Sequence, residues 1–165
     1  MGVFVPGVPK GLTGGEFVRR RRTILGLTQA ELADKSGVAQ PRIAEIEAGK
    51  RELTEVYAKN LLRALAVKPS EIMQKMRAEI RDKFQSLGLN EASVFGSAAS
   101  GKDEPGSALD FCVLINKESP AVGGLELMRL EAELERLTTV PVDINVDLGR
   151  PSPALDRMRR ERVRL

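Results

Sequence analysis

Two apolar segments separated by a Gly-Ser turn and a polar loop mark the part of the chain that is suited to chemistry. Residues 94–115 read VFGSAASGKDEPGSALDFCVLI, in which the first segment ends at Gly96-Ser97 and the second opens at Leu109-Asp110. A Gly lets the backbone approach a phosphate closely, and a Ser adds a hydroxyl donor. An Asp on the neighbouring strand can ligate a divalent cation. The layout indicates a nucleotide-handling site, although this chemistry favours a second acid at position 108, where the chain has Ala108.

The composition limits what the rest of the chain can do. A length of 165 residues suits one medium domain or two small ones. The chain has no His, which excludes His-based catalysis and His metal sites. A single Cys, Cys112, excludes an internal disulfide and predicts a cytoplasmic protein. No apolar run reaches the length of a membrane span, so no membrane partner is expected.

The charge distribution predicts two domains with different partners. Residues 1–75 carry 13 Lys and Arg against 8 Asp and Glu, residues 76–149 carry 7 against 13, and residues 150–165 carry 6 against 2. The basic front is suited to nucleic acid, and the acidic middle is suited to cations.

The elements that must position these residues can be read from Gly, Pro and apolar spacing. Residues 1–14 are rich in Gly and Pro and predict a flexible arm. A helix is expected from about Gly15, and its Arg19–Arg22 run fits either a solvated face or phosphate contact. Residues 54–67 predict a further helix, and 70–88 predict a connecting helix that starts the second domain.

Residues 26–50 predict two short helices joined by a tight turn. Thr28 and Glu31 form a capping-box pattern at the start of the first helix. Gly37 is free to take a positive φ in the turn, and Ala39 opens the second helix. Two helices joined in this way form a helix-turn-helix.

The order LTQAELA, then Gly, then Ile-x-x-Ile-Glu-x-Gly-Lys resembles the Cro/repressor (Xre-type) DNA-binding domain over residues 15–69. The resemblance implies a domain that binds double-stranded operator DNA, with a homodimer on a two-fold site. The positions that it implies for DNA contact are Thr28, Gln29, Ala39, Gln40, Pro41, Arg42, Glu45, Lys50 and Arg51.

Base reading is expected from the second motif helix. Gln40 suits an adenine edge, Arg42 suits guanine, and Glu45 could accept from cytosine N4. Lys50 and Arg51 are expected at the DNA backbone. Each of these residues, taken alone, also fits an ordinary exposed polar side chain.

The order Gly-Ser, then Ser-Ala-Leu-Asp, then a later Val-Asp resembles the minimal nucleotidyltransferases of the DNA polymerase beta superfamily, as in MNT-type antitoxins. The resemblance covers about residues 72–149, within an expected domain of residues 70–149. It implies that Asp110 and Asp143 are the catalytic and metal-binding acids. It also implies nucleotide binding by three small residues, which are Gly96, Ser97 and Ser107.

In such an enzyme two divalent ions clamp the attacking and leaving oxygens. Side chains alternate along a strand, so Asp-x-Asp would place two acids on one face, and Ala108 removes one of them. We therefore expect weak or no transfer, with a weakened site for ATP and Mg²⁺. A naturally degenerate binding domain and an engineered inactivation both account for Ala108.

The expected architecture is an all-α helix-turn-helix domain followed by an α/β (α+β) nucleotidyltransferase-like domain with a small mixed sheet. Residues 150–165 predict a basic C-terminal helix. The expected function is a transcriptional repressor that is the antitoxin of a toxin–antitoxin or defence operon, with a cognate toxin as partner. The alternatives are an active Mg²⁺-dependent enzyme that transfers AMP to a protein, and an ATP-sensing repressor.

Overall fold

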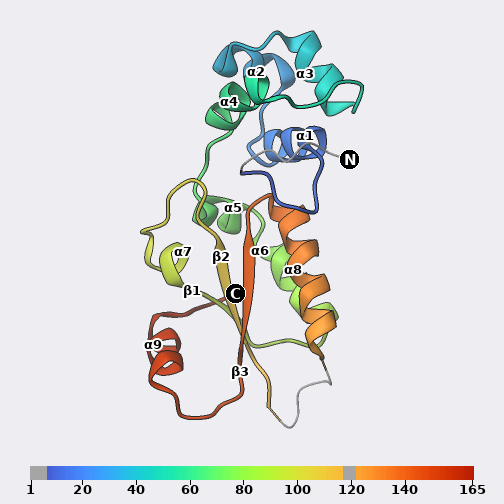
Figure 1. Ribbon diagram of the computed structural model, residues 1–165. Coiled ribbons are helices and arrows are strands. Elements are labelled where there is room, and N and C mark those ends of the chain that lie inside the picture. Colours follow the sequence, from blue (N-terminus) through green and yellow to red (C-terminus); the bar gives the residue numbers. More distant parts are fainter. Residues whose placement is uncertain (1–6, 117–121) are drawn as a thin grey trace. The chain divides into compact units, whose positions relative to one another are not determined.

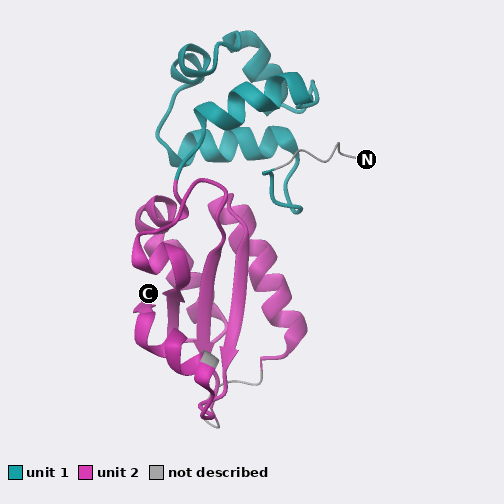
Figure 2. Cartoon of the chain, turned by 60° about the vertical axis from the view of Figure 1, so that its left-hand side comes forward, with its two compact units in different colours: residues 1–67 teal, residues 68–165 magenta. Residues whose placement is uncertain are grey.

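The computed structural model describes residues 7–116 and 122–165 (Figure 1). The chain forms two compact units, residues 1–67 and 68–165 (Figure 2). The boundary after Val67 lies two residues before the boundary expected from the sequence. Within the described residues, no helix is both long enough and apolar enough to cross a bilayer.

The first unit is helical, as predicted. Its helices are α1 (Gly14–Ile24), α2 (Gln29–Ser36), α3 (Gln40–Glu47) and α4 (Glu55–Ala64). The Thr28 hydroxyl accepts from the Glu31 N–H at 3.1 Å and the Glu31 carboxylate accepts from the Thr28 N–H at 2.7 Å, which confirms the capping box. Gly37 has a φ of 71°, and so the turn has the predicted left-handed residue.

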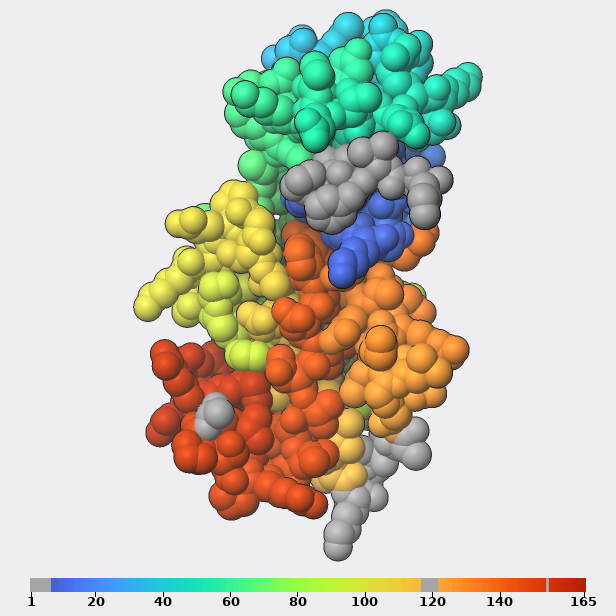
Figure 3. Space-filling model, viewed as in Figure 1, coloured from blue at the N-terminus to red at the C-terminus, as the bar shows by residue number. Residues whose placement is uncertain are grey.

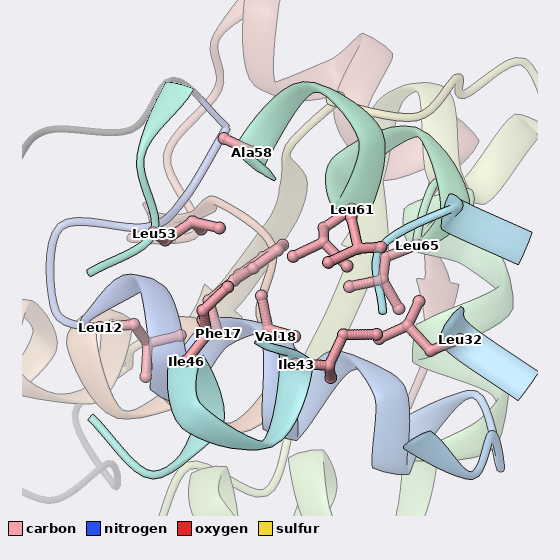
Figure 4. Packing of buried hydrophobic residues seen from close by; sticks show 11 residues of the cluster. Leu12, Phe17, Val18, Leu32, Ile43, Ile46, Leu53, Ala58, Leu61 and Leu65 are labelled. Atoms are coloured by element: carbon pink, nitrogen blue, oxygen red, sulfur yellow. The ribbon is translucent and has the colours of Figure 1, made fainter. Parts of the chain in front are cut away.

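All four helices contribute to one hydrophobic core, which fixes α3 against α1 and α2 (Figure 4). Ile43 and Ile46 are fully buried from α3, and Phe17 is buried from α1. Truncation of a buried Ile to Ala costs about 2–5 kcal/mol. Val56 of α4 does not join this core, because it is 74% exposed.

The start of the chain and the Arg run differ from expectation. Residues 1–6 of the expected arm lie outside the described residues, but Leu12 joins the core and Thr13 caps α1. Arg21 is buried: its guanidinium donates to the Leu65 carbonyl at 3.2 Å and lies over the Phe17 ring. Burial lowers the pKa of Arg21 to about 10. This Arg therefore packs the helix bundle, which excludes it from a solvated face.

The second unit combines a four-stranded sheet with helices, as predicted. In chain order its elements are α5 (Pro69–Lys75), α6 (Arg77–Ser86), β1 (Ala92–Phe95), α7 (Gly96–Ser100), β2 (Leu109–Leu114), α8 (Gly124–Thr138), β3 (Val142–Asp147), α9 (Pro153–Glu161) and β4 (Val163–Arg164). The sheet order is β3-β2-β1-β4, with β2 and β3 parallel and the other pairs antiparallel.

Helices lie on both faces of this sheet, with α6 and α8 on one side and α7 and α9 on the other (Figure 1). Phe111 of β2 points to the first side, where its ring meets Phe84 of α6 edge to face at 5.2 Å between centroids. Because side chains alternate along a strand, Asp110 and Cys112 point to the second side. The fold therefore presents the predicted acid on the face that α7 and α9 share.

Two predicted helices are corrected by the structure. The expected helix over 70–88 is two helices, because Met76 leaves helical geometry with φ −115° and ψ 19°. The C-terminal helix ends at Glu161, and Val163 and Arg164 pair instead with β1 as strand β4. Two residues are too few to show a strand periodicity in the sequence.

Candidate functional site

The first motif residues lie at the exposed start of α3. Ala39 is the N-cap residue and is exposed, and Gln40 and Pro41 follow it in the first turn, also exposed. Pro fits this turn because the first N–H groups of a helix have no partner within the helix. The side chains of this turn are thus available to an external partner, as the DNA-contact prediction requires.

Three charged residues at the end of this surface hold one another. The Glu45 Oε2 atom accepts from Arg42 Nη1 at 2.6 Å and from Arg51 Nε at 2.8 Å. The hydrogen bond from Arg51, followed by that from Arg42, holds the pKa of Glu45 below its ordinary value. The Glu45 carboxylate therefore holds two guanidinium groups together. Its side chain is already hydrogen-bonded within the protein in the absence of DNA.

The backbone after α3 brings Arg51 to this position. Gly49 has a φ of 70°, and its N–H donates to the Ile46 carbonyl at 3.0 Å. The Lys50 N–H donates to the Glu45 carbonyl at 2.9 Å, which completes a Schellman ending. The exposed Lys50 side chain follows directly, so both basic residues lie beside the C-terminal turn of α3.

A second charged cluster lies inside the helix bundle and has a structural role. The Glu47 carboxylate accepts two hydrogen bonds from Arg22, at 2.6 and 2.8 Å, and one from Gln29 at 3.0 Å. Burial raises the pKa of Glu47, but these hydrogen bonds and the Arg22 charge outweigh it, so its pKa lies below the ordinary value. Gln29, which was expected at the DNA, thus uses its side-chain amide to support the packing of the motif, and Arg22 is an internal partner of Glu47.

In the second unit the two predicted acids are brought together. Asp110 of β2 and Asp143 of β3 are register partners on parallel strands, and both face the side of the sheet that carries α7 and α9. Asp110 is half-buried and Asp143 is exposed. Burial, and next the neighbouring Asp143 charge, raise the pKa of Asp110. A cation between the two carboxylates would relieve this repulsion.

Gly96 lies directly against this acidic pair. Its φ is 71°, and a Cβ atom built on it would lie 2.8 Å from Asp110 Oδ2. The Asp110 carboxylate therefore occupies the space that a side chain at position 96 would need. Ser97 follows in the first turn of α7 and is half-buried. The Gly-Ser turn and the strand acid are thus adjacent, as their sequence order predicts.

Ser107 and Ala108 occupy the loop that leads into β2. The Ser107 hydroxyl accepts from the Glu104 N–H at 3.1 Å, so it closes the loop on itself. Ala108 directly precedes β2, two positions before Asp110, where strand alternation would place a side chain on the side of Asp110. The position that lacks an acid is therefore beside the acidic pair.

Two carboxylates fit one Mg²⁺ ion, which commonly takes one or two carboxylates and completes its octahedron with phosphate oxygens and water. Within residues 7–116 and 122–165, no group of three or more His, Cys, Asp or Glu side chains is arranged to hold a metal ion. A second ion would need a further ligand at position 108.

Two buried acids were missed by the sequence reasoning. The Asp103 side chain is 1% exposed, and its Oδ2 atom accepts from the Ser70 N–H at 2.7 Å. The Asp147 carboxylate, also 1% exposed, accepts two hydrogen bonds from Arg159, at 2.6 and 2.7 Å. Alternation along β3 places Asp147 on the face of Asp143, which was the available signal, while its Arg partner in the tail gave none.

Comparisons with known families agree with this geometry. The Helix-turn-helix family matches residues 18–72, and the Nucleotidyltransferase domain family matches residues 73–160, which is more than half of the chain. No individual curated protein matches the chain. The predicted fusion is confirmed, and the chain belongs to the nucleotidyltransferase domain family, with a DNA-binding helix-turn-helix domain before it.

Proposed function

We propose that the protein is a sequence-specific transcriptional repressor whose nucleotidyltransferase domain binds ATP and Mg²⁺ weakly and transfers little or no nucleotide. The observation that carries the DNA reading is the exposed first turn of α3 beside the Arg42–Glu45–Arg51 cluster. A guanidinium group fixed in direction loses less freedom when it meets a base edge. Cytoplasmic location follows from this proposal.

The cluster assigns different tasks to its members. Arg42 uses Nη1 for Glu45, which leaves its other N–H groups for a guanine edge. Gln40 lies two residues before Arg42, at the exposed start of the helix, and suits adenine. Lys50 and Arg51 would contact phosphates. As in other helix-turn-helix repressors that bind as dimers, two copies would read half-sites about one helical turn apart.

The nucleotide site supports binding better than transfer. Asp110 and Asp143 would hold one Mg²⁺ ion, and the ion, when bound, would neutralise phosphate charge and orient a triphosphate. Gly96 lets the backbone of the Gly-Ser turn lie directly against Asp110, which places the turn beside the proposed ion site. Ala108 offers no carboxylate for a second ion or for deprotonation of an acceptor, so the chain's own residues bind and orient the nucleotide.

The fusion is also suited to an antitoxin that represses its own operon. In that role the second domain would capture a cognate toxin, and α3 would bind the operator. Support comes from the pairing of a DNA-binding domain with a nucleotidyltransferase domain in one chain. The ATP-sensing alternative predicts instead that ATP changes operator affinity.

The repressor proposal is tested with a reporter gene driven by the promoter of the protein's own operon. Expression of the chain should lower reporter output, and Arg42→Ala should restore it. Gln85→Ala on α6 is a matched polar-to-Ala control outside the first unit and should repress fully. Unchanged reporter output with wild-type protein present would overturn the proposal.

A second candidate is an active transferase, which the closeness of Gly96 to Asp110 and the register pairing of Asp110 with Asp143 support. Incubation of the wild-type and Ala108→Asp chains with Mg²⁺ and ATP labelled on the α-phosphate distinguishes an active transferase from a binding domain. Label transfer by wild type would establish the enzyme. Transfer by Ala108→Asp alone would show that position 108 is what disables it.

A further inference from the structure

An open pocket of about 230 Å³ lies at the β4 edge of the sheet. Three arginines, Arg159, Arg162 and Arg164, line it together with Glu91, Ala92 and Ser93. Sites for drug-sized ligands commonly span about 300–1,000 Å³, so this pocket suits a small charged group with part of its carrier.

The three arginines differ in how their charge is used. Arg159 donates two hydrogen bonds to the buried Asp147 carboxylate and one to Asp156, so its charge is matched and its position is fixed. In the part of the chain that the structure describes, Arg162 and Arg164 form no ion pair. Two guanidinium groups without a direct ion-pair partner therefore line one small pocket, and the Arg162 charge also acts on the nearby Asp147 carboxylate.

Both groups are held by the fold. Arg164 lies on β4 as the register partner of Ser93, so strand alternation directs the two side chains to the same face. Arg162 follows α9 directly and interacts with the fully buried Cys112 thiol on that same face. The Ser93 hydroxyl makes only a long contact, 3.4 Å, to the Cys112 carbonyl and can donate to a bound oxygen.

We infer that this pocket binds a terminal phosphate group, held by Arg162 and Arg164 with the Ser93 hydroxyl. Guanidinium groups match phosphate oxygens in geometry, and a phosphate dianion matches two unpaired positive charges. Glu91 lines the rim and opposes any anion. Its carboxylate weakens the attraction of the pocket for phosphate. Neutralising Glu91 should therefore strengthen phosphate binding, whereas neutralising Arg162 or Arg164 should weaken it.

The pocket lies on the same sheet face as the acidic pair. Ser93 pairs with Cys112, and Phe95 pairs with Asp110, so the two sites are two residues apart, or about 7 Å of strand. On the surface, the residues of α7 and its loop, in yellow, lie beside the red C-terminal residues (Figure 3). The inference of a phosphate site goes beyond the proposed function and does not depend on it.

The test is a calorimetric titration of the full-length chain with AMP, inorganic phosphate and adenosine, in EDTA so that no divalent ion contributes. AMP should bind saturably and adenosine should not. Equal affinity for phosphate and AMP would assign free phosphate as the source, and tighter AMP binding would assign a nucleotide.

Variants locate the binding. The double variant Arg162→Gln with Arg164→Gln should lower the affinity for AMP at least tenfold. Glu91→Gln should raise that affinity severalfold. Arg160→Gln, which removes one charge at an exposed position of α9 and so matches the single Arg164→Gln variant, should change affinity less than twofold. The titration contains no divalent ion, so its outcome does not depend on whether Asp110 and Asp143 bind Mg²⁺ and ATP. Because Arg164 is exposed, Arg164→Gln alone remains folded and should still weaken AMP severalfold. Absence of saturable AMP binding, or equal losses with Arg160→Gln and Arg164→Gln, would overturn the inference.

Discussion

The Asp103 carboxylate accepts a hydrogen bond from the Ser70 N–H at 2.7 Å and is almost completely buried. Asp103 belongs to the loop between the Gly-Ser turn and the strand that carries Asp110, whereas Ser70 lies in the first turn of α5, directly after the boundary between the two units. The loop of the nucleotide site is thus tied to the first helix that follows the DNA-binding unit.

Loss of this tie should destabilise the second unit. Asp103→Ala leaves an α5 N–H without its acceptor and should cost about 1–2 kcal/mol, as for other caps. Urea denaturation followed by circular dichroism measures the change. Asp103→Asn keeps an oxygen acceptor and should lie close to wild type; an equal loss in both variants would show that the charge, and not the hydrogen bond, is what matters.

A side chain at position 96 should disturb the acidic pair. Gly96→Ala forces a Cβ atom toward Asp110 Oδ2, at 2.8 Å, in addition to the strain of a positive φ. We expect loss of Mg²⁺-dependent ATP binding, measured by titration of the full chain with ATP in the presence of Mg²⁺.

Gly101→Ala is the matched control, because Gly101 has a φ of 70° and nothing lies within 4 Å of a Cβ atom there. It carries the same backbone strain, about 1 kcal/mol, without the contact. If both variants lose ATP binding equally, the loss reflects reduced stability, and the close contact between position 96 and Asp110 does not matter for binding.

The Arg22–Glu47 pair should make the first unit sensitive to acid. The pKa of Glu47 is below its ordinary value when folded, so its stabilising contribution is present above the unfolded-state pKa of about 4.3 and is lost as the pH falls through the folded-state pKa. Glu47→Gln should therefore lower stability at pH 7, by roughly 2–3 kcal/mol, and flatten its fall in acid.

Thermal melts of both chains between pH 7 and pH 3 check this prediction. Other acids titrate in the same range, so the quantity of interest is the difference between the two chains. That difference should shrink as the pH falls. A constant difference at every pH would mean that Glu47 acts through packing alone.

Substitution of Arg42 and substitution of Lys50 should reduce DNA affinity in different ways. Arg42→Ala should cost about 1–3 kcal/mol, mainly at one base pair, because in the proposed complex Arg42, restrained by its hydrogen bond to Glu45, contacts a guanine edge. Lys50→Ala should weaken binding to all DNA sequences alike. It should also reduce by about one the slope of the logarithm of affinity against the logarithm of salt concentration. Fluorescence anisotropy on operator and random DNA at several salt concentrations measures both; equal losses from Arg42→Ala on both DNAs would reassign that residue to phosphate contact.

Local signals in the sequence were sufficient for the elements of the first unit. Thr28, Glu31 and Gly37 act within one or two turns of chain, so their roles follow from neighbours a few residues away. The acidic pair was predicted from a family motif, and the sheet register brings Asp110 to Asp143.

What escaped prediction depends on residues far apart in the chain. Arg21 lies in a basic run, which in the sequence indicates a solvated face. In the structure its guanidinium donates to the Leu65 carbonyl, which is 44 residues away in the chain. Asp147 and Arg159 meet only because α9 folds back over the sheet. Such pairs leave no periodic pattern, because tertiary packing and not local propensity creates them.

The most direct test of the repressor proposal is selection of DNA fragments from a random pool by the full-length chain, beside a chain carrying Gln40→Ala and Arg42→Ala. We expect wild type to enrich an inverted repeat whose half-site centres lie about one helical turn apart, and the double variant to enrich no sequence. A folded wild-type chain that enriches no sequence at low salt, or a double variant that enriches the same repeat, would contradict DNA reading by α3.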